Sequence, residues 1–238
     1  MNVEFVDSMG NDLTVVNAAR VSFDKESWWD TIPPSGPVEN VLCLADEKLI
    51  KYLSKHQHFT PFTHCTLTLR ETVPIFVARQ RFKHTIGFSY NETSRRYVSD
   101  MPEIYYPSEW RGKPDKAKQG SSLETIDINP VGNRPPPMVD EYHHAVKKCM
   151  WTYKYLLDKG VCPEQARMVL PQSMYTSYYV TGSLYAWARA YNLRSNKNSQ
   201  QEIQELANKW DVICQASFPY SWEALTCKDK DNETKVEG

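Results

Sequence analysis

The sequence lacks any apolar run approaching the ~20 residues that a membrane-spanning helix requires. Its beginning, Met1-Asn2-Val3-Glu4, lacks the basic residues and the apolar stretch of a signal peptide. Both absences argue against a membrane or secreted protein, so we expect the protein to be cytoplasmic.

An excess of positive charge is also missing, because 28 Lys and Arg residues face 29 Asp and Glu residues, for a formal net charge of -1. Proteins that coat nucleic acid through bulk electrostatics carry a large positive charge. The sequence therefore argues against that class, and any site for an anion must be local.

Closely spaced cysteine pairs are absent, which argues against the common zinc and thiol-exchange motifs. The six cysteines are scattered through a chain too large to depend on a disulfide framework, so we predict reduced cysteines that mostly serve packing. His56, His58 and His64 lie close together, but no His-Glu-x-x-His sequence and no cysteine cluster completes a tetrahedral shell. We therefore predict no metal site.

The residues that are present fit one globular domain over 1–238. Hydrophobic residues make up 41% of the chain and charged residues 24%, so the chain can bury a sizeable core. At roughly 150 residues per domain the length would also allow two domains, but mixed folds of about this length are commonly single.

The local patterns predict both strands and helices. Residues 3–6 and 13–16 are typical of a hairpin around a Gly10-Asn11-Asp12 turn. Asp46 is suited to cap a helix that ends at about Lys55. Further expected elements are a strand over 65–69, a helix from Ile75 to about His84 opened by Pro74, a helix over 139–156 ending at Gly160, a helix opened by Pro163 and stopped by Pro171, a strand over 173–181, a helix over 184–193, and a last helix capped by Ser199 and Glu202.

Two regions predict irregular structure. Residues 102–137 hold seven of the 15 prolines and little periodicity, so they form either a functional loop or a disordered one. The polar tail after Cys227 is expected to fray.

A basic segment from Arg79 to Tyr97 carries the strongest chemical signal. Five basic residues there are opposed only by Glu92, which leaves a local charge of +4. Helical spacing would put Gln80 on the same face as Lys83 and His84, so these polar groups would point at one ligand. The hydroxyl and amide side chains that follow suit a phosphate or a planar base. A solvated basic helix followed by a polar loop is the alternative interpretation.

This segment resembles the motif of the flavin-dependent thymidylate synthases, which is Arg-His-Arg, seven residues and Ser, with Asn-Glu-x-Ser-x-Arg-Tyr at its end. Asn91–Tyr97 matches the second half in full. In the first half, Lys83-His84-Thr85 replaces Arg-His-Arg, and one extra residue precedes Ser94. Lysine keeps the charge of arginine but not its planar fork, so its contact with phosphate or flavin should differ.

Other parts of the chain resemble further elements of the same family, in the same order. The matching segments are Ala18–Phe23, His56–His64, Ala166–Pro171, Leu193-Arg194 and Gln200–Ile203. Thr63 stands where many members have Glu, and Asn198-Ser199 replaces a usual His-Ala. Together the matches cover residues 18 to about 205.

The resemblance implies an α/β fold with a twisted, largely antiparallel sheet flanked by helices, assembled as a homotetramer whose sites are shared between chains. It implies reductive methylation of dUMP to dTMP, with methylenetetrahydrofolate donating the carbon and NADPH reducing FAD. The partners would be dUMP, folate and NADPH, with no nucleic acid and no membrane.

The resemblance also implies roles for particular residues. Catalytic roles would fall to Ser94, Arg194 and Glu92. Substrate binding would involve Gln80, Lys83, Ser94, Arg95, Arg96, Arg167 and Arg194. FAD binding would involve Ser22, His58, Thr60, Lys83, His84, Thr85 and Arg189.

For several residues a purely structural role is the alternative interpretation. Arg167 follows Glu164 by three and could form a surface ion pair instead. Tyr178, Tyr179 and Trp187 are expected to pack in the core.

Two alternatives for the whole chain also stay open. Basic residues interleaved with Phe82, Phe88 and Tyr90 could grip bases in a non-catalytic nucleotide or single-stranded nucleic-acid binding module. The departures at Thr63, Lys83 and Thr85 could instead have abolished flavin chemistry in a member of the family. The binding module predicts a colourless protein, so the colour of the purified protein separates it from the flavoenzyme.

Overall fold

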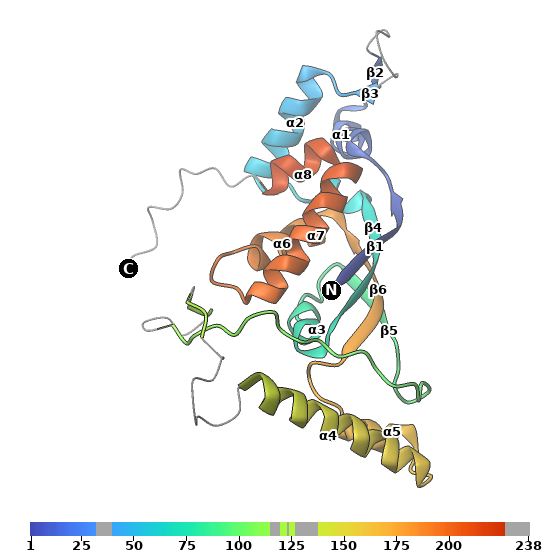
Figure 1. Ribbon diagram of the computed structural model, residues 1–238. Coiled ribbons are helices and arrows are strands. Elements are labelled where there is room, and N and C mark those ends of the chain that lie inside the picture. Colours follow the sequence, from blue (N-terminus) through green and yellow to red (C-terminus); the bar gives the residue numbers. More distant parts are fainter. Residues whose placement is uncertain (32–39, 115–119, 123, 127–137, 227–238) are drawn as a thin grey trace.

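A four-stranded antiparallel sheet, with its strands in the order β1-β4-β6-β5, forms the centre of the molecule (Figure 1). The computed structural model describes residues 1–31, 40–114, 120–122, 124–126 and 138–226. The sheet strands are β1 (Asn2–Met9), β4 (Thr66–Pro74), β5 (Phe88–Glu92) and β6 (Tyr175–Ser183). A separate two-stranded ladder pairs β2 (Asp30–Thr31) with β3 (Asn40–Val41).

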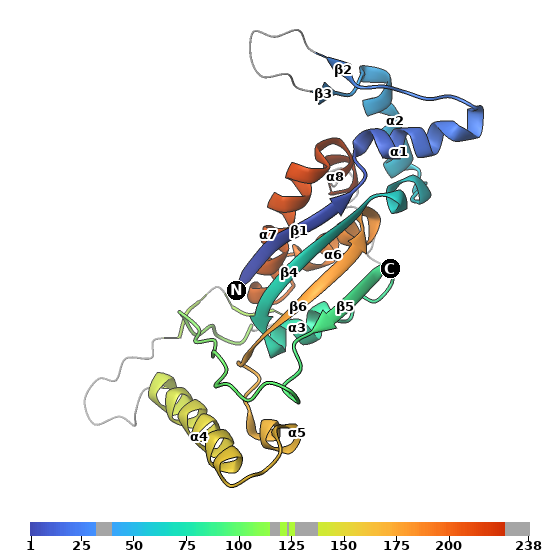
Figure 2. The same ribbon diagram turned by 90° about the vertical axis from the view of Figure 1, so that its right-hand side faces the viewer.

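Helices flank this sheet, as the sequence predicts for an α/β fold. They are α1 (Asp12–Arg20), α2 (Leu44–Lys55), α3 (Ile75–Arg81), α4 (Met138–Asp158), α5 (Pro163–Ala166), α6 (Leu184–Arg194), α7 (Gln201–Ser217) and α8 (Pro219–Thr226), with short 3-10 helices η1 (Val21–Phe23), η2 (Thr60–His64) and η3 (Arg167–Val169). Helices α6, α7 and α8 lie behind the strands in Figure 2, and no described helix covers the sheet face turned to the viewer.

Alternating side chains divide the two central strands into a buried and an open face. On β4 and β6 the buried face carries apolar residues such as Leu67, Leu69 and Val180. Between them, hydroxyl side chains turn to the open face, where Thr68 and Thr181 lie 2.9 Å apart across the pair. This period of two is typical of a sheet with one covered face. It confirms the strand predicted from Cys65 onward, which extends to Pro74.

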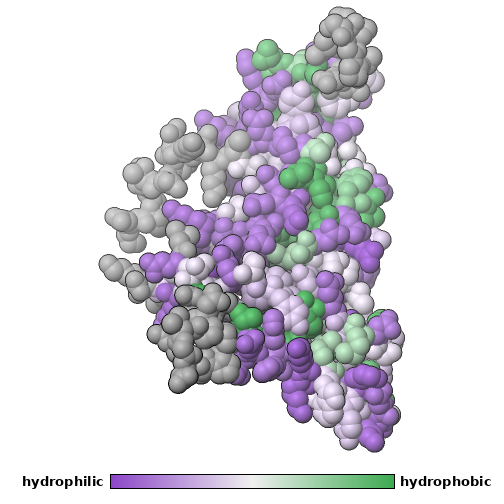
Figure 3. All heavy atoms as spheres, in the orientation of Figure 1, coloured by the Kyte–Doolittle hydropathy of each residue, from purple (hydrophilic) through white to green (hydrophobic). Residues whose placement is uncertain are grey.

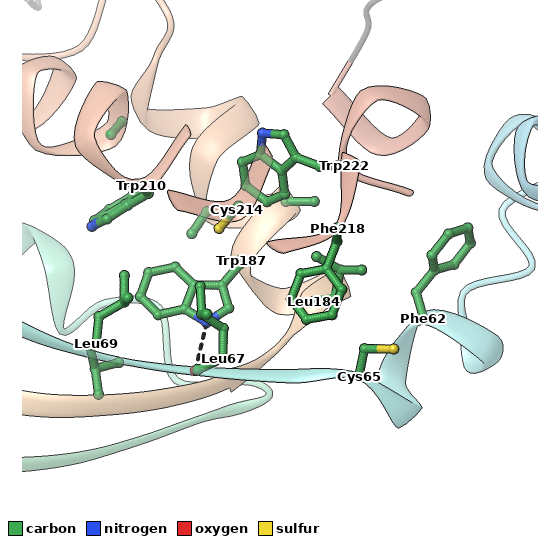
Figure 4. Packing of buried hydrophobic residues seen from close by; sticks show 14 of the residues in the cluster. Phe62, Cys65, Leu67, Leu69, Leu184, Trp187, Trp210, Cys214, Phe218 and Trp222 are labelled. Atoms are coloured by element: carbon green, nitrogen blue, oxygen red, sulfur yellow. Dashed lines mark hydrogen bonds between the residues drawn. The ribbon is translucent and has the colours of Figure 1, made fainter. Parts of the chain in front are cut away.

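Large aromatic side chains fill the space between the sheet and α6–α8. Trp187, Trp210 and Trp222 are fully buried, and the indole nitrogen of Trp187 donates to the carbonyl of Leu67 at 3.1 Å (Figure 4). This bond satisfies the one polar atom of the Trp187 ring inside the core. The prediction that Trp187 and Tyr178 pack in the core is confirmed, whereas the side chain of Tyr179 is half exposed on the open face.

One ion pair is buried completely in this core. Arg81 donates from its Nε to Glu71 at 3.3 Å, and both side chains have no exposed surface. The Arg81 guanidinium lies 4.3 Å from the ring centroid of Phe88 and 4.7 Å from those of Trp187 and Trp210. Aromatic faces attract a cation, so the rings and the carboxylate together replace the water that Arg81 has lost.

The face of the molecule seen in Figure 1 is mostly polar. On the face seen in Figure 1, hydrophobic residues form separate patches within a largely hydrophilic surface (Figure 3). The apolar side chains named above lie between the sheet and its helices instead.

The predicted N-terminal hairpin is wrong in its second arm. Residues 13–16 belong to α1, and Asn11 is the residue that caps this helix. The Asn11 side chain accepts from the Thr14 backbone at 3.0 Å, and the Thr14 hydroxyl accepts from the Asn11 backbone at 3.1 Å. This reciprocal capping box turns the chain out of the sheet directly after Gly10.

Two predicted helix caps and one helix end also differ from the structure. Asp46 lies inside α2, where it is buried and pairs with Arg20 instead of capping the helix. Gln200 precedes α7, while the Ser199 hydroxyl donates to the carbonyl of Leu193. Helix α3 ends at Arg81, so the predicted extension to His84 is wrong; Phe82 and Lys83 form a turn, and His84 follows it.

The remaining predicted elements are confirmed to within a few residues. Gly160 follows α4 with a φ of +81°, a conformation that favours glycine, and Pro163 begins α5. The described parts of 102–137 are mostly irregular. Residues 135–137 and the tail after 227 lie outside the described residues.

Candidate active site

Three arginines and a serine come together in a pocket between β5, the following turn and η3. This arginine pocket has a volume of about 530 Å³. Its polar lining includes Glu92, Ser94, Arg95, Arg96 and Arg167. Three guanidinium groups against one carboxylate make the pocket suited to an anion such as phosphate. Five residues predicted to bind or transform the substrate therefore share one cavity.

Short contacts orient the polar groups of the arginine pocket. The Arg96 Nε donates to the Ser94 hydroxyl at 3.2 Å, which ties the arginine to the turn that follows β5. Glu92 accepts from the hydroxyl of Thr176 at 2.7 Å, and Thr176 is buried on β6. Arg167 is exposed, and within the described part of the chain its side chain donates to the backbone carbonyl of Glu164 alone, so its guanidinium is accessible to a ligand.

Two further predicted substrate residues lie in a different cavity. This second pocket, which we call the asparagine pocket, has a volume of about 680 Å³ and is lined by Gln80, Gly120, Asn192, Leu193, Arg194, Asn196, Asn198, Ser199 and Gln200. The Gln80 amide donates to the side chain of Gln200, and the Arg194 Nη2 donates to the Gln80 carbonyl at 3.2 Å. Among the residues that the structure describes, none lines both the asparagine and the arginine pocket.

His84 is held at the edge of this second group in its neutral form. Its Nε2 accepts from the Nε of Arg194 at 2.8 Å, which requires an unprotonated nitrogen. Burial, followed by the charges of Arg194, Arg81 and Arg189, lowers the pKa of His84 to about 4. Burial and the charge of Arg81 also lower the pKa of Arg194 from its ordinary value. The remaining ring nitrogen of His84 is then a donor.

Two segments that carry predicted flavin residues, one around Phe59 and one on α6, contact each other. Phe59, between His58 and Thr60, stacks on Tyr185 with ring centroids 5.2 Å apart. Arg189 lies one turn further along α6, with its guanidinium 5.9 Å from the Tyr185 ring. The charge of Arg189 also acts on His84, and His84 accepts a hydrogen bond from Arg194, which lines the asparagine pocket.

The other predicted flavin residues are less closely tied to these segments. Lys83 and Thr85 are exposed on either side of His84. Ser22 is exposed in η1, and no described hydrogen bond joins it to the flavin residues named above.

The structure also shows contacts that the sequence did not predict. Phe59 and Tyr185 connect two predicted flavin segments, and Gln172 lines the arginine pocket. Tyr90 donates to the carbonyl of His84 at 2.7 Å while accepting from Arg81 at 2.6 Å. Tyr90 occurs inside the family motif, but no local pattern reveals which backbone atom its hydroxyl contacts.

None of the cysteines that the structure describes lines either pocket. Cys65 and Cys214 are buried, and burial raises the pKa of the Cys65 thiol to about 12 and that of Cys214 well above its ordinary value. Cys162 is exposed immediately before α5. Within the described ranges, no group of three or more His, Cys, Asp or Glu side chains is arranged to hold a metal ion. None of the described helices is both long and apolar enough to cross a membrane.

Comparison with known proteins shows which family the chain resembles. The family model described as "Thymidylate synthase complementing protein" matches residues 4–220. The flavin-dependent thymidylate synthase of Thermotoga neapolitana is 36% identical over 223 residues, which cover 94% of this chain and 89% of that protein. The corresponding enzyme of Kosmotoga olearia is 37% identical over 225 residues, with the same coverage.

A solved structure agrees with these relatives in fold. The UMP/dUMP methylase PolB from Streptomyces cacaoi, bound with 5-Br dUMP, superposes with a TM-score of 0.74 and 28% sequence identity, covering 94% of each chain. The match of the family model over most of the chain, and identities above 30% with relatives covered almost completely, decide the assignment. The chain belongs to the flavin-dependent thymidylate synthase family.

Proposed function

We propose that this protein methylates dUMP to dTMP, using methylenetetrahydrofolate as the carbon donor, FAD as cofactor and NADPH as reductant. The observation that carries the proposal is the arginine pocket, where Arg96 and Arg167 accompany Ser94 from the family motif. PolB, which shares the fold, is a methylase crystallised with a brominated dUMP.

In this proposal the arginine pocket holds the monophosphate. Ser94, Arg95, Arg96 and Arg167 would donate to phosphate oxygens, and guanidinium groups can do so through two parallel bonds. Glu92, fixed by Thr176, would accept a hydrogen bond from the nucleotide. Attack by the weakly nucleophilic pyrimidine carbon is easier when fixed donors stabilise the charge that develops on the ring carbonyls. Arg194 is the candidate for that role.

The residues beside the asparagine pocket fit a flavin cofactor. A flavin has a flat ring system and a diphosphate, and the series from His58 and Thr60 to Arg189 and His84 offers aromatic faces, a cation and a neutral imidazole donor. Lys83 and Thr85 are exposed next to His84, and Ser22 would contribute from η1. FAD bound there would supply the hydride chemistry, while the chain supplies orientation and charge.

The division into two pockets supports a site shared between copies of the chain. Gln80 and Arg194 occupy the asparagine pocket, whereas Ser94 and Arg167 occupy the arginine pocket. If all four contact one nucleotide, the two pockets must face each other across an interface between chains. We therefore propose a homotetramer in which different copies complete each site, and a cytoplasmic location where dUMP, folate and NADPH are accessible.

The decisive experiment measures FAD and product together. The purified protein should carry FAD, or take it up stoichiometrically, as read from its visible absorbance after gel filtration. The same sample should form dTMP from dUMP, methylenetetrahydrofolate and NADPH. A colourless protein that fails to bind micromolar FAD would favour the nucleotide-binding module, and FAD binding without dTMP formation would favour a member that has lost its chemistry.

A further inference from the structure

His84 lies in the short connection between α3 and β5, where its direct neighbours do not hold it. Lys83 and Thr85 on either side are exposed, whereas His84 is half-buried and accepts from Arg194 at 2.8 Å. Connecting segments move more than the helices and strands that they join. A constant direction of the imidazole toward Arg194 therefore depends on a contact that ties the His84 backbone to a rigid element.

Tyr90 of β5 makes this contact. Its hydroxyl donates to the carbonyl of His84 at 2.7 Å and accepts from the Nη1 of Arg81 at 2.6 Å. Arginine can only donate, so the single proton of the hydroxyl must point away from the guanidinium. The carbonyl of His84 is its nearer acceptor, since the carbonyl of Arg81 is 3.4 Å away. Burial above all raises the pKa of Tyr90 to about 12, so the hydroxyl keeps this proton at neutral pH.

Arg81, which directs the Tyr90 hydroxyl, is itself fixed in the core. Its Nε donates to Glu71 at 3.3 Å, and its guanidinium lies 4.3–5.2 Å from the centroids of four aromatic rings. A buried ion pair is weak evidence for stability, because apolar residues of similar volume are often equally stable in its place. The hydrogen bond to Tyr90 is a contact that an apolar side chain at position 81 would not make.

The charge of Arg81 acts on the same pair of residues. It contributes, after burial and Arg194, to lowering the pKa of His84 to about 4, and after burial to lowering the pKa of Arg194. A neutral His84 is the form that can accept from Arg194. Arg81 therefore supports the pair in two ways, through the hydroxyl of Tyr90 and through its own charge.

We propose that Tyr90, held by Arg81, is a positioning residue for the methylation reaction. Through the carbonyl of His84 it fixes the imidazole, and the imidazole in turn fixes the guanidinium of Arg194. Neither Tyr90 nor Arg81 lines the arginine or the asparagine pocket, so both act through His84. The inference rests on the role proposed above for Arg194, which is to stabilise charge that develops on the pyrimidine. Loss of the Tyr90 hydroxyl should therefore reduce turnover more than dUMP binding.

The kinetic test compares Tyr90→Phe with Tyr178→Phe in the full-length, FAD-loaded protein. Tyr178 is the matched control, because its hydroxyl donates to Glu71 in the same network and, among the described residues, no hydrogen bond joins it to His84. We expect Tyr90→Phe to lower kcat about tenfold or more and to change the KM for dUMP less than about threefold. Tyr178→Phe should stay within about twofold of the wild type in both constants. In a His84→Ala background, where Arg194 has lost its acceptor, Tyr90→Phe should lower kcat by less than about twofold.

A spectroscopic measurement tests the same contact without turnover. Because the Nε2 of His84 accepts from Arg194, the neutral ring carries its proton on Nδ1. Solid-state NMR of protein with nitrogen-labelled histidine reports this tautomer, and His84→Ala identifies the signal. We expect one tautomer in the wild type and in Tyr178→Phe, and a mixture in Tyr90→Phe.

Thermal unfolding shows whether each variant is folded. If Tyr90→Phe is not, Arg81→Lys decides by the same measurements, because lysine keeps the charge but not the fork that reaches both Glu71 and Tyr90. The proposal is overturned if the folded variant keeps the wild-type His84 signal, or if Tyr90→Phe lowers kcat equally with and without His84. A changed His84 signal in a protein whose wild type makes no dTMP would uphold the positioning of His84 and reject the proposed function.

Discussion

Arg194 donates its Nε hydrogen to the Nε2 of His84 at 2.8 Å, joining residues that are 110 positions apart in the chain. The bond fixes the protonation state of one residue and the direction of the other. His84 must be neutral to accept, and the guanidinium is turned toward the Gln80 carbonyl. His84 is the middle residue of Lys83-His84-Thr85 in the family motif. It therefore orients Arg194, the arginine that we propose contacts the pyrimidine.

The neutral state of His84 makes stability depend on pH. Its pKa is about 4 in the folded chain and near 6.5 in the unfolded chain, mainly because of burial and then Arg194. Below about pH 6.5 the unfolded chain binds a proton that the folded chain does not, so stability is lost as the pH falls toward 4. His84→Gln keeps an acceptor for Arg194 but cannot titrate. The melting temperature of this variant should fall less than that of the wild type between about pH 7 and about pH 5.

His144→Gln provides the control for this measurement, because His144 is exposed on α4. It should follow the wild-type pH dependence. Parallel curves for wild type and His84→Gln would mean that His84 does not resist protonation as described.

Arginines of the arginine pocket should act on the nucleotide and not on the flavin. We expect Arg167→Ala and Arg96→Ala each to weaken dUMP binding by about 1.5–3 kcal/mol, the loss typical of a charged hydrogen bond. FAD affinity should change far less. Arg70→Ala, on the open face of the sheet, is the control that should affect neither ligand. Equal losses for dUMP and FAD would show that these arginines have been misassigned.

The ion pair between Arg81 and Glu71 should be sensitive to loss of one partner. Glu71→Gln leaves a fully buried guanidinium without its counter-charge, so we expect about 3–5 kcal/mol of destabilisation in denaturant unfolding. Glu4→Gln removes one partner of the exposed Glu4–Arg70 pair, whose closest N and O atoms are 3.9 Å apart. That control should cost no more than about 1 kcal/mol. A similar small effect for Glu71→Gln would show that the core tolerates the unpaired charge.

No cysteine should be needed as a nucleophile. Cys65 and Cys214 are buried thiols with raised pKa values, and Cys162 is exposed beside the four-residue helix α5. We expect every Cys→Ser variant, Cys162→Ser included, to keep dTMP formation within about tenfold of the wild type, or ~1.4 kcal/mol in barrier. One cysteine replacement that abolishes turnover while FAD and dUMP still bind would contradict the proposed flavin mechanism.

Patterns with a clear period predicted most of the fold. Apolar residues alternate with polar ones in β4 and recur every three to four residues in α4. Both patterns follow the buried side of the element, so they can be read from the sequence. The hairpin prediction failed because residues 13–16 are β-branched or apolar, whereas the Asn11–Thr14 capping box decides for a helix. Residue preference was outweighed by two local hydrogen bonds.

The candidate site was predictable only in part. The family resemblance assigned Ser94 and Arg194 to the same substrate, although they lie in different matching segments, and the chain places them in separate cavities. Long-range packing sets this distance, and no local spacing encodes it. The stacking of Phe59 on Tyr185 joins segments more than 100 residues apart, so it too could be found only in the folded chain.

The strand order has a consequence for how the chain reaches this state. The hydroxyl contact of Thr68 and Thr181 spans 113 residues, and that of Glu92 and Thr176 spans 84. Strands that are far apart in the sequence must meet before their backbone hydrogen bonds can form. Closing such a long loop of chain is slow. Newly made chains would therefore expose the apolar face of β4 for longer than a protein built from local hairpins. Substitutions that weaken the β4–β6 pairing should accordingly reduce how much active enzyme accumulates in a cell more than they reduce the turnover of each folded molecule.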